Sequence, residues 1–329
     1  MAIDKSTRKK IISIVVLIAF LAVASSLGMN LDEFFPFADS STESSINTNY
    51  SESVQHFKGK MIITMLDVGQ ADSFLLEQNG ITALIDFGTK STGEDVVKYL
   101  KKRGISRLDY VFGTHPHDDH MGGMSEILSN FEIGTIIIPK ITKNTITSNW
   151  YLSLMKQIKN GKYKVVYPKN GMEFSLGNAK LKVLGPIEEP DSNLNNYSTV
   201  IMASFGEMDV LFTGDMESDF EKKLLKSGTN LDAEILKIGH HGSDTSTSNE
   251  FLNAVSPDYA LISTRIGNKF DHPSESTMLK LKEKQIPVYR TDECGTVIIS
   301  ITSNSVNFST NPGNYLSGTK LALKEGIKK

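Results

Sequence analysis

From Lys60 onward, short apolar runs bounded by turn residues alternate with stretches whose apolar side chains recur at helical spacing. The runs MIITML, SFLLEQ and ITALID have the length and composition of strands and predict three strands in succession. Residues 91–104 (STGEDVVKYLKKRG) contain a capping threonine, repeat apolar side chains and end at a glycine, so we expect a helix there. LDYVFGT predicts the next strand.

The second half of the chain continues this alternation. Helices are expected over residues 149–159, 217–226, 249–255 and 274–284. Two sheets packed face to face with helices outside would bury such a set of elements, although the alternation alone is equally compatible with a doubly wound sheet. Further strands are expected at GTIIIP, AKLKVLG, TVIMASF, DVLFTG, AEILKIG, DYALIST, PVYRT and TVIISIT.

The first 58 residues have a different pattern. Basic residues within positions 5–10 precede an apolar run over residues 11–27. This is typical of a secretory signal, and it is also just long enough for a membrane anchor. Either role for residues 1–28 places the body outside the cytoplasm, because the basic flank stays inside; a buried core helix is the alternative. Residues 29–58 include a tract rich in Ser, Thr and Asn, which predicts a flexible linker.

The body that follows is long enough for one large domain, which we place at residues 59–310, with a short basic tail at 311–329. The net charge of −3 and the pI near 6.2 exclude a generally basic surface, so binding to nucleic acid would need a local basic patch. The single cysteine, Cys294, excludes an internal disulfide and a cysteine-rich zinc site. Candidates for a basic patch, or for a solvated helix face, are Lys140, Lys143, Lys156 and Lys159, near Trp150 and Tyr151.

Acids and histidines follow five of the expected strands. Strand ends gathered at one edge of a sheet are where functional sites are built on rigid scaffolds. The densest group is THPHDDHMGG, with three histidines and two aspartates within six positions. Imidazole and carboxylate ligands suit Zn²⁺, with Mn²⁺ or Fe also possible in a site without thiolate. The residues at the strand ends are Asp67, Asp86, His115 to His120, Asp215, and His240 with His241.

The motif THPHDDHMGG resembles the H-x-H-x-D-H signature of the metallo-β-lactamase superfamily. The motifs LDVGQADSFLL, IDFG, LFTGD, LKIGHHGS and HPS followed by YRTDECGTV are similar, in the same order, to the extracytoplasmic domain of ComEC-type competence proteins. This resemblance covers about residues 61–301. It implies an α+β fold, an αββα sandwich of the metallo-β-lactamase type, with two divalent metal ions at one edge.

The resemblance also implies a set of ligands. His115 and His117 would bind the first ion, Asp119, His120 and a later histidine would bind the second, and Asp215 would bridge the two. HHGS leaves the later histidine open: we favour His240, which comes first after its strand, with His241 as the alternative. Zn²⁺ is the expected metal and Mn²⁺ the second choice.

One departure from many superfamily members bears on the chemistry. No histidine lies between His120 and His240, where those members supply a further ligand to the first ion. The corresponding region, LNNYSTVIM, is similar to the N-x-x-S of ComEC relatives, with Asn195 and Ser198 at those positions. This argues against β-lactam or thioester hydrolysis. Asn195 would then contact the substrate, or form a local backbone bond in a turn.

Several nearby residues have expected supporting roles. Asp67 and Asp86 would orient ligand histidines, or Asp67 would be a plain turn residue. Asp118 lies off the ligand register and is expected to face solvent or a neighbouring histidine. His272 would protonate a leaving group, hold a phosphate or begin a helix. Lys237 and Thr291 also match family positions, without a role that the sequence assigns.

A site with two metal ions suits phosphodiester hydrolysis, because two cations stabilise both the attacking and the leaving oxygen. Asp119 and Asp215 would act on the reacting water. We therefore expect an extracytoplasmic phosphodiesterase with DNA as its leading substrate, in contact with a membrane through its N-terminal segment if that is uncleaved. The alternatives are a phosphorylcholine-esterase-like hydrolase of envelope phosphodiesters and a non-catalytic binding protein. No protein partner can be inferred.

Overall fold

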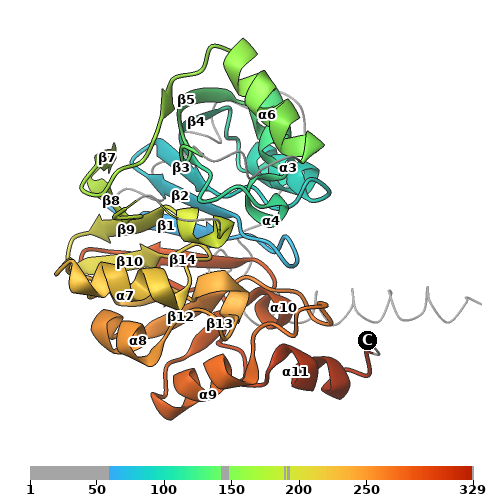
Figure 1. Ribbon diagram of the computed structural model, residues 1–329, viewed down its shortest axis with the longest axis vertical. Helices are drawn as coiled ribbons and strands as arrows, with labels where there is room; N and C mark the ends of the chain where they lie inside the picture. The colour runs from blue at the N-terminus through green and yellow to red at the C-terminus, as the bar shows by residue number, and fades with distance from the viewer. Residues whose placement is uncertain (1–58, 142–147, 189, 191–192, 328–329) are drawn as a thin grey trace, which may run out of the picture. The chain divides into compact units, whose positions relative to one another are not determined.

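The computed structural model describes residues 59–141, 148–188, 190 and 193–327 (Figure 1). The expected signal or anchor and linker, residues 1–58, lie outside this part, as does Lys143. No helix among the described residues has the length and apolar character that crossing a membrane requires.

One sheet has eight strands in the order β15-β14-β1-β2-β3-β4-β5-β6. The strands from β15 to β3 pair antiparallel, whereas β3, β4, β5 and β6 pair in parallel. The bounds are β1 (Met61–Met65), β2 (Phe74–Gln78), β3 (Ile81–Ile85), β4 (Arg107–Phe112), β5 (Glu132–Ile137), β6 (Val165–Val166), β14 (Val297–Ile301) and β15 (Val306–Phe308).

The other sheet has seven strands in the order β13-β12-β11-β10-β9-β8-β7. Its strands pair antiparallel from β7 to β10 and in parallel from β10 to β13. The bounds are β7 (Glu173–Leu176), β8 (Ala179–Gly185), β9 (Val200–Phe205), β10 (Met208–Phe212), β11 (Ile235–Lys237), β12 (Tyr259–Ile262) and β13 (Val288–Arg290).

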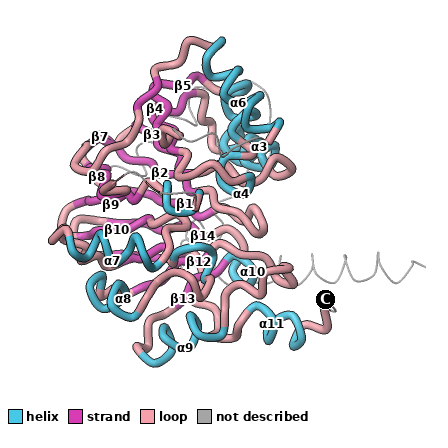
Figure 2. The backbone as a smooth tube through the Cα atoms, viewed as in Figure 1, coloured by secondary structure: helices cyan, strands magenta, loops and turns pink. Residues whose placement is uncertain are grey.

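Alternation along the strands divides the apolar side chains between three cores. Ala83 and Ile85 of β3 belong to the core between the sheets, where Phe74 packs edge-on against Phe212 with ring centroids 5.2 Å apart. Leu84, between them in sequence, packs against the helices outside the first sheet. A third core joins the second sheet to its own helices. The strands thus lie between two sets of helices (Figure 2), and the expected αββα sandwich is confirmed.

The helices on the first sheet are α3, α5 and α6, and those on the second sheet are α7, α8 and α9. The expected basic tail is folded in its described part, because α11 buries Leu321 and Ala322. The bounds are α3 (Gly93–Lys102), α4 (Asp118–Met121), α5 (Met124–Asn130), α6 (Asn149–Asn160), α7 (Ser218–Lys226), α8 (Asn249–Val255), α9 (Glu275–Glu283), α10 (Thr291–Cys294) and α11 (Gly318–Lys324), with the 3₁₀ turns η2 (Leu194–Tyr197) and η3 (Gly239–Gly242).

Candidate metal centre

The loops that follow β3, β4, β10 and β11 meet at one edge of the sandwich. The backbone N–H of Thr114, after β4, donates to Asp86, after β3, and the N–H of His240, after β11, donates to the carbonyl of Gly214, after β10. Nε2 of His120, after β4, lies 3.2 Å from Oδ2 of Asp215, after β10, so residues at strand ends of both sheets come to one place.

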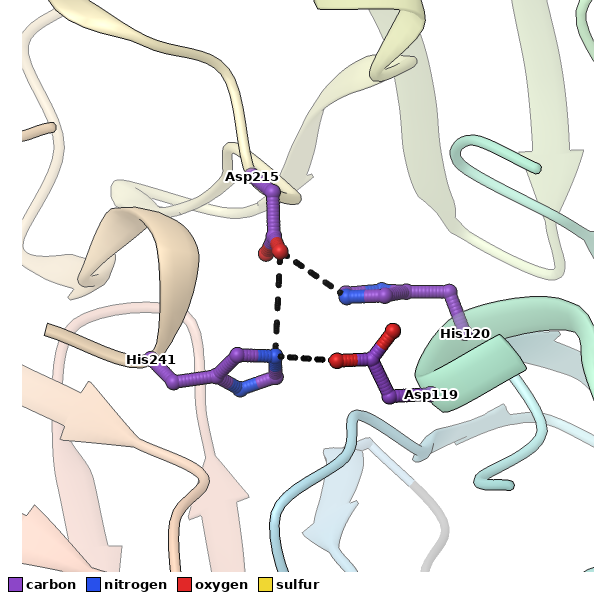
Figure 3. Close-up of side chains that lie close together, drawn as sticks. All are labelled: Asp119, His120, Asp215 and His241. Carbon is purple, nitrogen blue, oxygen red and sulfur yellow. Dashed lines mark ion pairs between the residues drawn. The ribbon is translucent and has the colours of Figure 1, made fainter. Parts of the chain in front are cut away.

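Four side chains converge there (Figure 3). Asp119, His120, Asp215 and His241 each present one potential ligand atom, and these atoms all lie within 4.8 Å of one another. The Oδ2 atom of Asp215 is 3.2 Å from Nε2 of His120 and 3.7 Å from Nε2 of His241. His241 Nε2 is also 3.5 Å from Oδ2 of Asp119.

This set fits a divalent metal ion. Nε2 of His120, Nε2 of His241 and Oδ1 of Asp215 are buried and have no hydrogen-bond partner among the described residues. Buried polar atoms are nearly always satisfied, so these unpartnered atoms need an explanation. A cation held by imidazole and carboxylate would satisfy them together.

His115 and His117, the expected ligands of a first ion, border this group. His115 Nε2 lies 3.0 Å from Nδ1 of His117 and 3.8 Å from Oδ2 of Asp215. Ser198 lies behind them: its Oγ is 3.4 Å from His115 Nδ1 and accepts the backbone N–H of Asp215. Ser198 thus links the two-histidine side of the site to the aspartate that the resemblance makes the bridge.

The structure separates the roles of the two adjacent histidines. The backbone of both His240 and His241 is left-handed, with φ of 50° and 52°, which is uncommon outside glycine and turns the chain sharply. His241 is buried, and its Nδ1 lies 2.9 Å from the carbonyl oxygen of Ser263. His240 is partly exposed, and its Nδ1 lies 3.2 Å from Oγ1 of Thr245. We favoured His240 from the sequence, but His241 completes the buried group.

Asp86 is placed to orient a ligand, as predicted from the sequence. Its Oδ2 lies 2.7 Å from Nδ1 of His120, and its two oxygens accept from the backbone N–H and the hydroxyl of Thr114. With Nδ1 of His120 donating to a carboxylate, Nε2 is the nitrogen that would bind a metal ion in the group of four.

Asp67 does not have the expected orienting role. It is exposed, and its Oδ1 accepts the N–H of Gly69, so it is the plain turn residue of the alternative. Asp72, five residues later in the same turn, was not predicted from the sequence. Buried Asp72 pairs with Nζ of Lys237 at 2.9 Å, and its Oδ1 lies 3.4 Å from Nδ1 of His241. The signal available was an acid flanked by Ala71 and Ser73 where the next strand begins.

Asn195 and His272 lie at the margins of the site. The side-chain N–H of Asn195 donates to Glu217 at 2.9 Å, so in this arrangement the amide positions Glu217. The ring of His272 packs edge-on against His240 with centroids 5.4 Å apart, and its Nδ1 lies 3.4 Å from Nε2 of Gln70.

Two other positions that the sequence singled out lie beside the site. Asp118 is exposed, in keeping with its position off the ligand register. The hydroxyl of Thr291 donates to the carbonyl of Thr264 and joins the ends of β12 and β13.

The buried carboxylates and imidazoles shift one another's pKa values. Burial alone would raise the pKa of Asp215, but His120 and His241 outweigh it and hold the pKa well below its usual range. Burial lowers the pKa of His241, yet Asp215 and Asp72 outweigh it and raise the pKa to about 10. The pKa of His115 is lowered by burial and then by the charge of His120. Without metal, the carboxylate of Asp215 thus stays ionised beside a protonated His241. A metal ion that binds this ring would displace its proton.

Comparison with known proteins agrees with this geometry. The sequence model of the metallo-beta-lactamase superfamily matches residues 66–264. ComE operon protein 3 of Bacillus subtilis is 30% identical over 270 residues, which are 76% of this chain and 34% of that protein. Competence protein ComA of Neisseria gonorrhoeae is 30% identical over 239 residues, 71% of this chain and 31% of that protein.

Recombination protein 2 of Haemophilus influenzae is 30% identical over 243 residues, 72% of this chain and 28% of that protein. The chain spans about a third of the length of these curated relatives. The resemblance to competence proteins is confirmed. Because the family model covers more than half of the sequence, the chain belongs to the metallo-β-lactamase superfamily.

Proposed function

We propose that the chain is a metal-dependent phosphodiesterase that cleaves DNA. The observation that carries the proposal is the buried convergence of Asp119, His120, Asp215 and His241, with unpartnered ligand atoms, beside His115. Similarity to a protein named for competence and to one named for recombination supports DNA as the substrate.

The residues divide into two ligand sets around Asp215. His115 and His117 would hold one divalent ion, and Asp119, His120 and His241 the other, with Zn²⁺ preferred by the nitrogen and oxygen donors and Mn²⁺ second. Bound there, such ions supply a nucleophilic water at neutral pH and neutralise charge on the reacting phosphate.

The chain's own groups would orient the phosphate and the protons. Gln70 donates from Nε2 toward Nδ1 of His272, since Oε1 of Gln70 accepts from the hydroxyl of Thr264. Burial, followed by the charges of His241 and His240, lowers the pKa of His272 to about 4. His272 is therefore neutral at pH 7 with its proton on Nε2, which can donate to a phosphate oxygen. Asp119 would accept a proton from the attacking water.

The basic and apolar segment at residues 1–28 extends the proposal to location. We infer that the body works outside the cytoplasm, with residues 1–28 in contact with the membrane unless they are cleaved. Protease treatment of intact cells should degrade the body and spare a cytoplasmic marker protein. Protection of the body until the cells are lysed would contradict this location.

The direct test is metal content and activity of the purified full chain. We expect about two divalent ions per chain and hydrolysis of both bis-p-nitrophenyl phosphate and single-stranded DNA. Asp215→Asn should abolish both activities, while Asp219→Asn, at a carboxylate that is 82% exposed on α7, should change neither.

Three outcomes would contradict the proposal. Less than one ion per chain together with full activity of Asp215→Asn would exclude a metal-dependent enzyme. Cleavage of a choline phosphoester but not of DNA would make the chain a phosphorylcholine esterase. Metal binding without hydrolysis of any substrate would make it a binding protein.

A further inference from the structure

A cavity of about 720 Å³ opens beside the metal centre and includes Asp119 in its lining. One wall is the loop between β12 and α9, which contributes Arg265, Asn268, Lys269 and Phe270. Cavities of several hundred Å³ accommodate small organic ligands, so this space can take a nucleotide-sized portion of a substrate that continues past the reacting phosphate.

Phe270 is an exposed aromatic side chain on that wall, with 52% of its surface accessible. Its ring lies nearly parallel to the ring of His272, at an interplanar angle of 25° and a centroid distance of 5.7 Å. His272 packs in turn against His240, whose Nε2 is 3.7 Å from Oδ2 of Asp215. A series of rings therefore leads from the open cavity wall to the metal centre.

The loop that carries Phe270 is held in place. Buried Asn268 accepts the backbone N–H groups of Phe270 and His272, both at 3.1 Å. The C-terminal segment braces the loop from outside, because the N–H of Gly318 donates to the carbonyl of Pro273 at 2.9 Å. An exposed aromatic ring on a fixed backbone loses little conformational entropy when it binds a partner.

Two cations share the wall with Phe270. Within the part of the chain that the structure describes, neither Arg265 nor Lys269 forms an ion pair with a carboxylate, and Nζ of Lys269 lies 4.8 Å from the centroid of the Phe270 ring. The lining also includes the carboxylates of Asp67, Asp95, Asp118 and Asp119. An anionic backbone would therefore contact the two cations on the Arg265–Phe270 wall and lie away from these carboxylates.

We propose that Phe270, Arg265 and Lys269 form a subsite for single-stranded nucleic acid, with one nucleobase on Phe270 and the neighbouring phosphates on the two cations. The subsite rests on the proposed function, since the strand continues from a phosphate at the metal centre. It requires an unpaired strand, because a ring can stack only on a base whose face is free.

The test compares binding of two single strands by the full chain loaded with Zn²⁺. One is a fluorescent oligothymidylate with phosphorothioate linkages, which resist cleavage, and the other is an abasic strand with the same backbone. Phe270→Ala should weaken binding of the first strand roughly tenfold and leave the abasic strand unchanged, whereas Phe270→Trp should preserve binding. The control is Leu279→Ala, which removes a 47% exposed apolar side chain on α9 and should change neither affinity.

The cations are tested by salt dependence. Lys269→Gln should reduce the slope of log affinity against log salt by about 0.7, the value for one phosphate contact to a single strand. Unchanged binding by Phe270→Ala, an equal loss with the abasic strand, or a similar loss in Leu279→Ala would each overturn the subsite. Failure of the unaltered chain to bind the base-containing strand would do so too.

The binding contrast does not depend on cleavage. If the unaltered chain hydrolyses no phosphodiester while the contrast holds, the proposed function fails and the subsite stands. If the chain cleaves DNA but Phe270→Ala binds normally, the subsite fails and the proposed function stands.

Discussion

The Nζ atom of Lys237 lies 2.9 Å from Oδ2 of Asp72, and both side chains are almost completely buried. The other carboxylate oxygen, Oδ1, lies 3.4 Å from Nδ1 of His241. The ion pair therefore fixes the carboxylate that helps to hold the ring of His241 toward the metal centre. The pair joins the turn before β2 in the first sheet to β11 in the second.

Removal of one partner of this pair should destabilise the fold. Lys237→Met leaves the carboxylate of Asp72 buried without its cation, which costs about 3–5 kcal/mol of unfolding free energy. Urea unfolding of the metal-free chain measures the loss. Lys98→Met, which removes the cation of an exposed pair on α3, is the matched control and should leave the midpoint unchanged. A Lys237→Met variant as stable as the control would show that the pair is not structural.

Asp86 should act on metal affinity through His120. Asp86→Asn weakens the acceptor for Nδ1 of His120, and loss of such a partner lowers metal affinity by roughly 10- to 100-fold. Competition with a chromophoric chelator measures the affinity. Asp118→Asn, at the exposed acid within the ligand loop, should bind Zn²⁺ as the unaltered chain does. Equal affinities in the two variants would contradict the orienting role of Asp86.

Substitution of His240 and of His241 should have different effects on metal content. His241→Ala removes a buried member of the group of four, so one equivalent of metal should be lost. His240→Ala should retain the metal, because its ring lies at the rim against His272. Metal content of the two purified variants decides the assignment. Loss of metal from His240→Ala alone would restore the choice that the sequence favoured.

His240 and His241 are site residues whose roles the sequence could not separate. The ligand loop between His115 and His120 could be identified because its residue types and spacing are specific. The choice between His240 and His241 could not be made, because both residues have a left-handed backbone that residue type and spacing do not predict. Asp72 was missed for a similar reason, since its partner Lys237 is distant in sequence and only the packing of the two sheets brings them together.

The elements of the fold also differ in how well the sequence predicts them. The strands and helices with clear periodicity were predicted close to their bounds, and helix α8 matches residues 249–255. The two-residue edge strand β6 is too short to have a period. Helix α11 was not predicted from its basic stretch, because Leu321 and Ala322 become buried only against the rest of the chain.

The pKa of His241 predicts how the stability of the metal-free chain depends on pH. Burial lowers this pKa, but Asp215 and Asp72 outweigh burial and raise it to about 10, against about 6.5 in the unfolded chain. A raised histidine pKa contributes stability that is complete below the unfolded value and is lost as the pH rises through the folded value. His120, whose pKa is also raised, acts in the same direction.

The unfolding free energy in EDTA should therefore fall by about 1–3 kcal/mol between pH 7.5 and 9.5. Urea unfolding at several pH values measures this fall, and His241→Gln should show a smaller one because the titrating ring is gone. With saturating Zn²⁺ the fall should disappear, because the metal ion replaces the proton on the ring. A free energy that stays constant or rises across this window in EDTA would show that His241 is not held protonated by Asp215 and Asp72.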